Sequence, residues 1–385
     1  MKAELAPSQS APITDRPKVL HVGKFYPPHM GGIETHLQAL CEQLRQSLPI
    51  GVVVSSDGVE ASREFLRGVP VSRVATRLVL ASTPLCPSMI GEIRRSDADI
   101  VHLHLPNPMA VLAYLASGHP GKLVVTYHSD TVRQRVLGAF FQPLLHRLLR
   151  RSAAIIATSP GYRRTSLVLS RHLDRCHVIP YGIPLDQFEY CEPSAVDGLR
   201  KKYGDRLVIS VGRLVYYKGF EYLIRAMAKV NGKLLIAGDG PLRPSLEKLS
   251  RELGLGERVV LLGEIQNQEL IPYYHAADVF ALASVARSEA FGIVQIEAMA
   301  SGLPVINTNL DSGVPFVSRD GETGLTVPPK DSDALAAALN HLLDNPELRR
   351  SLGGAARARA RQEFSVATMA SRTFELYSQV ARGRR

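Results

Sequence analysis

Short runs of consecutive apolar residues recur along this sequence, and most are followed by a loop and then by a stretch with helical spacing. A first series extends from Lys18–Val22 to Ala154–Thr158, and a second extends from Leu207–Val211 to Val305–Thr308. Strands that are buried on both faces of a parallel sheet show this pattern, because helices cover both faces. The alternation therefore predicts an α/β fold with doubly wound parallel sheets.

A segment that contains two prolines and a glycine, at 178–184, separates the two series. A single hydrophobic core stops growing beyond roughly 250–300 residues, so a chain of 385 residues should divide into at least two domains. We place an N-terminal Rossmann-like domain at 17–190 and a C-terminal Rossmann-like domain at 191–364. The remaining residues, 365–385, have helical spacing, and we expect them to form a last helix that crosses back to the N-terminal domain.

Composition limits the setting and the partners of the chain. The net charge of +10 favours an anionic partner. Nucleic acid is disfavoured, because Trp is absent and the other aromatic residues are scattered. No run approaches the ~18 apolar residues of a membrane-spanning helix, and the four cysteines lack metal-like spacing. Residues 1–16 have no signal-peptide core and are expected to form a disordered tail, so a cytoplasmic location is expected.

Two glutamates, Glu289 and Glu297, bracket a turn into a predicted helix. The helix should begin near Phe291 or Gly292 and end at Gly302, because glycine is favoured just beyond a helix C-terminus. Amides at its start favour an anion. The Glu289 carboxylate can accept hydrogen bonds from sugar hydroxyls, and that of Glu297 from a ribose diol. Two solvated glutamates at a helix start are the ordinary alternative.

A second group of candidate residues lies in the loop that follows the strand at 207–211. Arg213 and Lys218 belong to this loop, which contains Gly212 and Gly219. At the carboxyl end of a strand, the two cations can reach a pyrophosphate, the arginine as a planar fork and the lysine as a point charge. The alternative is a pair of ordinary surface cations.

The order and spacing of these segments closely resembles the family-four glycosyltransferases, which are retaining enzymes with the two-domain GT-B fold. The resemblance covers nearly the whole chain, and its specific part is C-terminal: the Gly-Arg-Leu…Lys-Gly loop, the Ala-Gly-Asp-Gly-Pro turn at 237–241, and the paired glutamates followed by Gly-Leu-Pro-Val. It implies that Arg213 and Lys218 bind the donor diphosphate, Glu297 the ribose and Glu289 the transferred sugar. The other donor-binding residues that it implies are Gly238, Ala290, Phe291 and Gly292, with the backbone at Glu264 and Ile265 beside the base.

In the N-terminal half, the resemblance covers a glycine-rich loop and one histidine. Gly31 and Gly32 match the family's loop and helix start, which contributes amides to the diphosphate in the closed state, and glycine permits this close approach. His128 ends a strand, and in similar enzymes this histidine contacts the donor sugar near the reacting centre. The expected catalytic residues are therefore His128, Glu289, Arg213 and Lys218, although a lone histidine at a strand end is more often structural.

Two patterns raise the question of a metal. His102 and His104 point to the same face of a strand, because side chains alternate with period two, but no third ligand is evident, and a core or cleft-lining role is expected. The Asp-Ala-Asp and Asp-Ser-Asp triplets at 97–99 and 331–333 look like the metal signature of another glycosyltransferase fold. They precede a strand and begin a helix, where turn and capping roles suffice. We expect no metal and no cofactor, with cations and helix amides stabilising the leaving diphosphate.

Residues 131–152 form a basic amphipathic segment without an acidic residue. It contains five arginines, namely Arg133, Arg135, Arg147, Arg150 and Arg151. Such a helix can lie on an anionic membrane surface, or it can pack its apolar side into the core and leave a solvated basic face. Both alternatives remain open from the sequence.

The function that we expect is transfer of a hexose from a nucleoside diphosphate sugar to an acceptor hydroxyl, with retention implied by the resemblance alone. The stretches at 105–108 and 127–130 look like those of bacterial O-antigen and exopolysaccharide enzymes. They favour GDP-mannose or a related GDP-hexose, with a UDP-sugar as the main alternative. The expected acceptor is a saccharide or a lipid-linked sugar in cell-surface polysaccharide or glycolipid synthesis, at the inner face of the cytoplasmic membrane.

The sequence disfavours two other classes of protein. A nicotinamide-dependent oxidoreductase is disfavoured, because the first loop lacks the Gly-x-Gly-x-x-Gly pattern and the turn at 238–240 is followed by Arg243 where the third glycine would stand. A non-catalytic GT-B protein that only binds nucleotide sugars is disfavoured because every expected donor contact is present.

Overall fold

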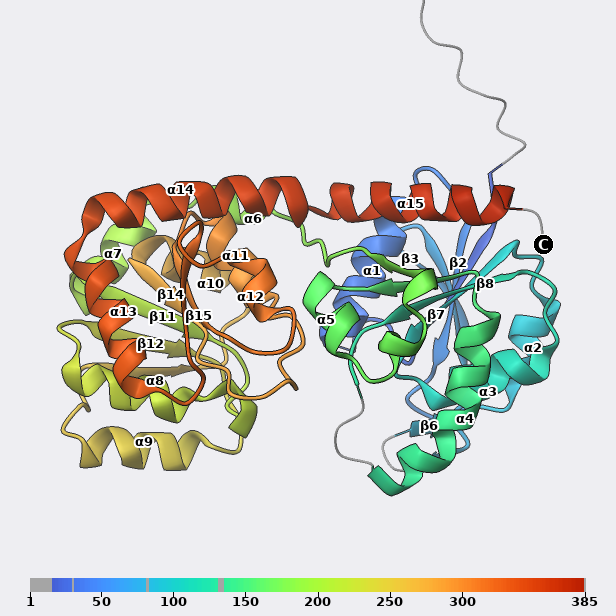
Figure 1. Cartoon of the computed structure of the whole chain (residues 1–385), viewed down its shortest axis with the longest axis horizontal. Helices are drawn as coiled ribbons and strands as arrows, with labels where there is room; N and C mark the ends of the chain where they lie inside the picture. Colours follow the sequence, from blue (N-terminus) through green and yellow to red (C-terminus); the bar gives the residue numbers. More distant parts are fainter. Residues whose placement is uncertain (1–15, 30, 81–82, 131–134, 384–385) are drawn as a thin grey trace, which may run out of the picture.

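The computed structural model describes residues 16–29, 31–80, 83–130 and 135–383. The chain forms two α/β domains that lie side by side, with two long helices along one edge (Figure 1). The predicted tail, apart from Arg16, lies outside the described residues.

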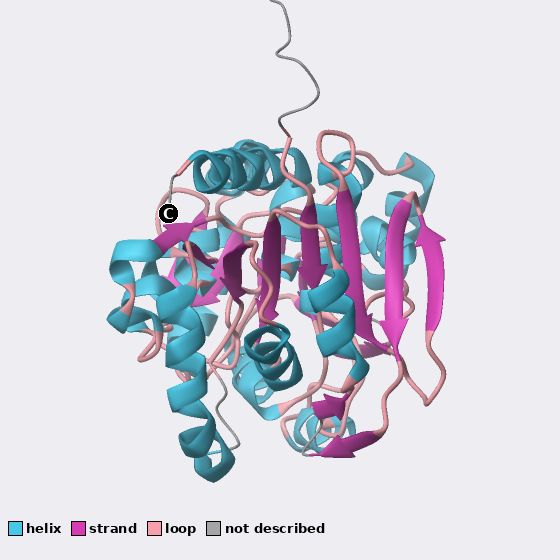
Figure 2. Ribbon diagram, turned by 90° about the vertical axis from the view of Figure 1, so that its right-hand side faces the viewer, coloured by secondary structure: helices cyan, strands magenta, loops and turns pink. Residues whose placement is uncertain are grey.

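The N-terminal domain is built on a sheet of eight strands within the described residues, in the order β10-β9-β8-β7-β1-β2-β4-β3. Its strands are parallel except for the β3–β4 pair at one edge. Figure 2 looks onto this domain, with helices packed against the strands. The strands are β1 Val19–Val22, β2 Ile50–Ser55, β3 Ser62–Leu66, β4 Val69–Val74, β7 Ile100–Leu105, β8 Lys122–Tyr127, β9 Ala154–Ala157 and β10 Cys176–Val178, and β5 Leu78–Leu80 pairs with β6 Thr83–Leu85.

The helices of this domain follow the strands in the predicted alternation. Every residue of β1, β7 and β9 is buried, because helices cover both faces of the sheet. The helices are α1 Gly32–Leu44, α2 Ser88–Arg95, α3 Pro108–Ser117, α4 Arg135–Arg151 and α5 Pro160–Thr165, with the short 3-10 turns η2 Leu169–Arg171 and η3 Leu173–Arg175.

The C-terminal domain has a second, fully parallel sheet in the order β13-β12-β11-β14-β15-β16. Its strands are β11 Leu207–Val211, β12 Lys233–Ala237, β13 Val259–Gly263, β14 Val279–Ala281, β15 Val305–Thr308 and β16 Gly324–Val327. Its helices are α7 Pro193–Tyr203, α8 Phe220–Ala226, α9 Arg243–Glu252, α10 Asn267–Ala276, α11 Val294–Ala300, α12 Val314–Val317, α13 Ser332–Asp344 and α14 Pro346–Glu363, with the 3-10 turns η4 Tyr216–Lys218 and η5 Met227–Lys229. The predicted doubly wound fold is therefore present in both halves.

The sequence boundary between 190 and 191 lies too late. Tyr181, Ile183 and Phe188 belong to the hydrophobic core of the C-terminal domain, and α6 Asp186–Glu189 packs against α10 and α11. The chain therefore crosses between the domains near 179–181, because the apolar side chains after that point are buried by C-terminal helices.

The second crossing is at the junction of α14 and α15 Val366–Arg382. α14 packs on α11 of the C-terminal domain, and α15 packs on α1 of the N-terminal domain, as Figure 1 shows at the upper edge. The two crossings are hydrogen-bonded to each other: the Ile183 N–H donates to the Phe364 carbonyl, and the Val366 N–H donates to the Ile183 carbonyl. The two segments that connect the domains therefore lie side by side.

The basic segment 131–152 is described in part. Residues 131–134, and with them Arg133, lie outside the described residues, as do the side chains of 135–140. In the rest of α4, the side chains of Leu145, Leu148 and Leu149 are buried in the core of the N-terminal domain, and those of Arg147, Arg150 and Arg151 are exposed. Core packing thus accounts for the apolar side of α4 where it is described. Among the described helices, none has the length and apolarity needed to cross a bilayer.

Candidate active site

The candidate donor residues gather where the strand order of the C-terminal sheet changes direction. From β11 the chain moves to β12 and β13 on one side, and it then returns to β14 on the other side. The loop after β11 carries Lys218, and the segment after β14 carries Glu289. Ligands of open α/β sheets bind at such a point, at the carboxyl ends of the strands.

Lys218 and Glu289 form an ion pair with 2.6 Å between Nζ and Oε2. The side chains are only 11% and 10% exposed, so this pair is shielded from water far more than a surface salt bridge. The Ser284 hydroxyl also donates a hydrogen bond to Oε2 of Glu289, at 3.2 Å. The cation predicted to bind a diphosphate and the carboxylate predicted to bind a sugar therefore lie in direct contact.

Two glycines allow the backbone to approach closely around this pair. Gly219 has φ +67°, and a Cβ there would lie 2.1 Å from the Ala283 carbonyl oxygen. Gly238 has φ +136°, and its Cβ would lie 2.1 Å from the carbonyl oxygen of Gly212. Only glycine fits both the dihedral angle and the space, so the turns after β11 and β12 can pack together beside Lys218.

Glu297 lies on α11, within the electrostatic reach of the same lysine. The Tyr274 hydroxyl donates a hydrogen bond to Oε2 of Glu297, at 2.7 Å. Burial raises the pKa of Glu297, while this hydrogen bond and the Lys218 ammonium act in the opposite direction. Lys218 is thus near both glutamates.

The predicted helix that carries Glu297 begins later than expected. α11 starts at Val294, because Gly292 has φ +74°, which an α-helix does not accommodate. Ala290, Phe291 and Gly292 therefore form an irregular turn before the helix. The predicted end is confirmed, since α11 finishes at Ala300 and Gly302 has φ +85°.

The remaining predicted residues of this domain lie in the segments after β11 and β13. Arg213 is exposed, and it is close enough to Tyr217 to lower the pKa of that phenol, although burial raises this pKa overall. Glu264 and Ile265 follow β13, with the Glu264 side chain exposed and that of Ile265 half-buried.

The N-terminal domain faces this site through the start of α1. α1 begins at Gly32, and Gly31 precedes it in an extended conformation. A Cβ at Gly32 would lie 3.8 Å from Ile293 Cδ1, which places the glycine loop opposite the turn before α11. The segment next to Glu289 makes a further contact, since the Arg287 guanidinium donates a hydrogen bond to the Thr165 carbonyl at 3.0 Å.

His128 is buried beneath this boundary, with only 1% of the residue exposed. Both of its ring nitrogens have partners: Nδ1 contacts the Tyr181 hydroxyl, and Nε2 lies 3.1 Å from Nδ1 of His104. Burial lowers the pKa of both histidines, so both imidazoles are neutral at pH 7. The Tyr181 ring also meets Phe291 edge-on at 4.9 Å, which connects His128 to the turn that follows Glu289.

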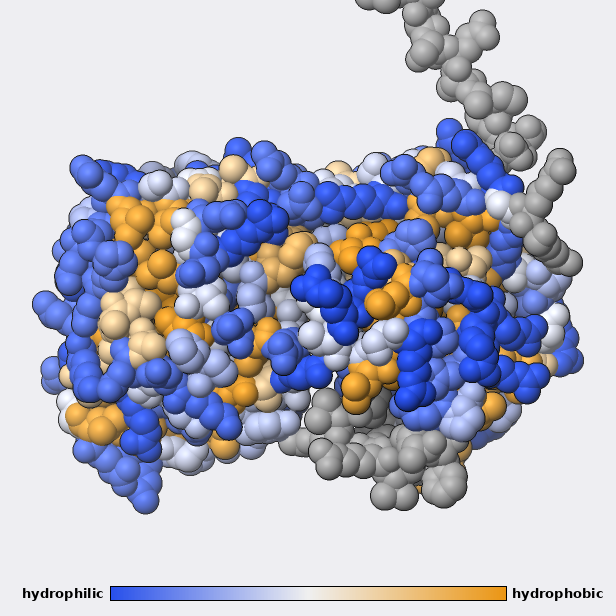
Figure 3. All heavy atoms as spheres, viewed as in Figure 1, coloured by the Kyte–Doolittle hydropathy of each residue, from blue (hydrophilic) through white to orange (hydrophobic). Residues whose placement is uncertain are grey.

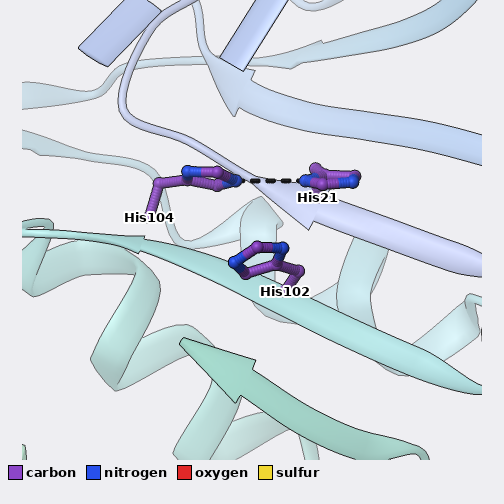
Figure 4. Close-up of side chains that lie close together, drawn as sticks. All are labelled: His21, His102 and His104. Atoms are coloured by element: carbon purple, nitrogen blue, oxygen red, sulfur yellow. Dashed lines mark hydrogen bonds between the residues drawn. The ribbon is translucent and has the colours of Figure 1, made fainter. Parts of the chain in front are cut away.

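His102 and His104 are buried in the core, and the structure places beside them a third histidine that was not evident from the sequence. β1 pairs with β7 in a register that aligns His21 with His102, and Nδ1 of His21 lies 3.0 Å from Nε2 of His104 (Figure 4). His21, His102 and His104 are close enough to hold a metal ion, as are His36, His104 and His128. The histidines of β1 and β7 do not reveal from the sequence that they lie close together, because this depends on the order of the strands in the sheet.

The aspartate triplets have the structural roles that were predicted. The Asp99 carboxylate accepts a hydrogen bond from the Lys18 backbone, and Asp97 forms an exposed ion pair with the Lys18 side chain. Asp331 caps α13 by accepting from the N–H groups of Asp333 and Ala334. Contacts with Lys18 therefore account for Asp97 and Asp99, and helix capping accounts for Asp331.

Three residues of the site had no sequence signal of their own. Tyr274 lies inside α10, Arg287 stands among small and polar residues, and Tyr181 lies in the crossing between the domains. Their partners Glu297, Thr165 and His128 are distant in sequence. The only indirect signal was for Tyr181, which lies in a segment rich in proline and glycine between the two domains.

Comparison with known families divides the chain into two matched parts, with the division between residues 187 and 194. Residues 30–187 match the family described as Glycosyltransferase Family 4, and residues 194–359 match Glycosyl transferases group 1. The chain is 34% identical to D-rhamnosyltransferase WbpZ of Pseudomonas aeruginosa, over 91% of this chain and 92% of that protein. It is 30% identical to O-antigen chain mannosyltransferase C of Escherichia coli, over 94% of this chain and 98% of that protein.

Solved structures with the same architecture cover nearly the whole chain. HepE of Anabaena, solved in complex with UDP, has a TM-score of 0.78 at 23% identity and covers 94% of this chain and 100% of that chain. Sucrose-phosphate synthase of Thermosynechococcus elongatus has a TM-score of 0.77 at 25% identity and covers 94% of this chain and 99% of that chain. A further relative, 30% identical over 94% of this chain and 98% of its own length, is the GDP-mannose-dependent α-(1-6)-phosphatidylinositol monomannoside mannosyltransferase of Mycolicibacterium smegmatis.

Proposed function

This chain belongs to the GT-B glycosyltransferases, with a family 4 domain followed by a group 1 domain, and from this premise we propose that it transfers a hexose from a GDP-sugar to an acceptor hydroxyl with retention. The observation that carries the proposal is the shielded Lys218–Glu289 ion pair at the switch point of the C-terminal sheet. A diphosphate beside Lys218 places its sugar near Glu289 and its ribose toward Glu297.

The proposed base and sugar of the donor are inferred from the names of the relatives. One relative is named a GDP-mannose-dependent mannosyltransferase and another an O-antigen chain mannosyltransferase. These names support GDP-mannose or a related GDP-hexose. HepE has been solved in complex with UDP-glucose, but at 22% identity that likeness bears on the fold alone. A UDP-sugar therefore stays as the alternative donor.

In the proposed reaction, the bond between the anomeric carbon and the diphosphate oxygen breaks while the acceptor oxygen bonds to the same carbon from the same face. The acceptor proton passes to an oxygen of the departing diphosphate. Glu289 is engaged by Lys218 and Ser284, which favours binding of sugar hydroxyls over attack on the anomeric carbon. Lys218 and Arg213 stabilise the charge that grows on the leaving group.

We expect binding and turnover of the donor to be independent of a metal or other cofactor, because fixed cations replace the metal at the diphosphate. A donor at 100 times its dissociation constant stabilises a protein by about 2.7 kcal/mol, so GDP-mannose should raise the melting temperature, with and without EDTA. The measurement is thermal unfolding with GDP- and UDP-sugars, beside release of GDP with and without EDTA.

Three results would contradict this proposal in distinct ways. A larger thermal shift with a UDP-sugar rejects the GDP donor. Loss of turnover in EDTA that magnesium or manganese restores rejects metal independence. Binding without any release of nucleoside diphosphate, even by slow hydrolysis, favours a protein that only binds nucleotide sugars.

The acceptor is proposed to be a saccharide or a lipid-linked sugar at the inner face of the cytoplasmic membrane. The relatives named for O-antigen and phosphatidylinositol mannoside synthesis support this class. The exposed arginines of α4 supply an electrostatic contact for an anionic surface. Because the described leucines of α4 lie in the core, this contact rests on charge more than on insertion of apolar side chains.

Salt-sensitive binding to anionic vesicles is the expected result of this contact. Each arginine near an anionic surface contributes about 1 kcal/mol, so Arg147→Gln, Arg150→Gln and Arg151→Gln together should weaken binding by about 3 kcal/mol. The control replaces three exposed cations of the C-terminal domain, Lys201, Arg225 and Arg251. Vesicle sedimentation at low and high salt measures the effect. Equal binding to neutral vesicles, or equal losses in both triple variants, would refute a contact through α4.

A further inference from the structure

Four histidines and two tyrosines form a continuous chain of hydrogen bonds through the N-terminal domain. The contacts run from the Thr126 hydroxyl through His102, Tyr377, His21, His104 and His128 to the Tyr181 hydroxyl. Every member is buried, and none is more than 6% exposed. Buried polar groups are normally satisfied, but few side-chain networks extend over so many members, since most side-chain hydrogen bonds go to the backbone.

The three central rings meet end to end. His21 and His104 have ring centroids 5.4 Å apart with 3.0 Å between the contacting nitrogens, and His104 and His128 have 5.4 Å and 3.1 Å. Figure 4 shows the first of these contacts, with His102 beside it. Facing nitrogens suit a shared proton. A tetrahedral metal, by contrast, needs nitrogens that converge on one point about 2.0–2.1 Å away. The geometry is that of a hydrogen-bonded chain.

The chain fixes the tautomers of its members together. A neutral imidazole has one N–H donor and one acceptor nitrogen, so each contact determines the direction of the next. Between Tyr377 and Tyr181, His21, His104 and His128 must all carry the proton on Nε2, with donation toward Tyr377, or all on Nδ1, with donation toward Tyr181. A mixed arrangement would set two N–H groups or two lone pairs against each other in the interior.

Both ends of this central section lie on elements that connect the domains. Tyr181 belongs to the first crossing, and its ring contacts Phe291 of the C-terminal domain. Tyr377 belongs to α15, the helix that follows the second crossing. Among the histidines of the chain, His128 is the one that is connected to the turn after Glu289, through Tyr181. A change at either crossing therefore reaches His128 through the direction of the chain.

We propose that His104, His21, Tyr181 and Tyr377 are positioning residues that hold His128 in one orientation and one tautomer for the transfer reaction. The proposal rests on the proposed function for the role of His128 at the donor sugar. The hydrogen-bonded chain itself does not depend on that role.

The test replaces each terminal hydroxyl in turn in the full-length protein. Tyr377→Phe removes the partner of His21 Nε2, and an N–H without an acceptor is less tolerated in the interior than a free lone pair. We expect the three histidines to shift together to the Nδ1–H form. Tyr181→Phe removes the partner of His128 Nδ1, and we expect the same three to shift to the Nε2–H form. Nitrogen-15 NMR with labelled histidine measures the tautomers.

The kinetic part compares the two variants with the wild-type enzyme. The variant that moves His128 away from its wild-type tautomer should lower kcat by about tenfold, with KM for the donor little changed, and the other should stay near wild type. Tyr26→Phe is the matched control: Tyr26 is fully buried in the same core cluster as Tyr377, and its hydroxyl has no partner within the described structure. This control should alter neither the tautomers nor kcat.

The two readouts separate the failures. Unchanged nitrogen shifts at His104 and His128 in both Tyr377→Phe and Tyr181→Phe would overturn the chain. Shifted tautomers with kcat equal to wild type in both variants would overturn the positioning role. Absence of transfer in the wild-type enzyme with every donor would overturn the proposed function, while the NMR measurement would still decide whether the chain exists.

Discussion

Lys218→Ala should lower turnover at saturating donor by roughly a hundred- to a thousandfold, which is the typical effect of removing one preorganised group that stabilises transition-state charge. Negative charge on the diphosphate grows as the glycosidic bond breaks, so a fixed cation stabilises the transition state more than the ground state. Affinity for the nucleoside diphosphate should fall less than turnover. Affinity for the monophosphate should change least, because it lacks the charge nearest to the breaking bond.

The surroundings of Lys218 predict how far other side chains can replace it. A Cβ on Gly212 would lie 3.1 Å from Lys218 Nζ, so the lysine runs closely along the backbone. Lys218→Arg should rescue turnover only in part, because a planar guanidinium takes the place of a compact ammonium. The control is Lys229→Ala, which breaks an ion pair of 2.7 Å with Asp333 whose side chains are 64% and 75% exposed. Steady-state kinetics and calorimetry measure both effects. Wild-type turnover in Lys218→Ala would show that this lysine has no role in the reaction.

Glu289→Gln should lower turnover by a similar factor, roughly a hundred- to a thousandfold, and leave the affinity for free GDP intact. The amide has the same shape and keeps an oxygen for the Ser284 hydroxyl, but it loses the charge that faces Lys218. In this variant, Lys218 has no ion pair with residue 289 that must break when the diphosphate binds. Affinity for GDP should therefore be unchanged or higher.

Glu297→Gln is the matched control for Glu289→Gln, because the two changes remove the same charge at opposite ends of the donor. The Tyr274 hydroxyl donates to the Glu297 carboxylate, which leaves the other carboxylate oxygen for the ribose. This variant should have a lower affinity for GDP and a higher KM for the donor. Calorimetry with free GDP separates the two variants. If Glu289→Gln abolishes GDP binding, the assignment of Glu289 to the sugar is wrong.

Much of the fold was predictable because its signals are contiguous. The strands expected at 207–211 and 305–308 match β11 and β15, since buried parallel strands form unbroken apolar runs. β3 was not predicted, because it is a largely exposed antiparallel edge strand without such a run. The domain boundary was placed late, because the sequence of α6 does not state which core it will join.

The loop after β11 and the segment with Glu289 were proposed as parts of the site because each follows a predicted strand, and Glu297 because it lies on the helix that comes next. Their convergence at one edge follows from a parallel sheet alone. What the sequence left open was the contact itself: whether Lys218 faces Glu289 or water depends on how closely the turns at Gly212 and Gly238 pack.

The sequence by itself determined which residue types stand at the ends of the strands, and with them the two sheets and the donor loops. Only the tertiary structure decided that His21, His104 and His128 form one chain, because their contacts require β1, β7 and β8 to lie side by side. The contact of His21 with Tyr377 further requires α15 to return across the domains. Tyr377 and His21 are 356 positions apart. No local pattern encodes such a contact, and it persists because each buried donor needs an acceptor that only the folded chain supplies.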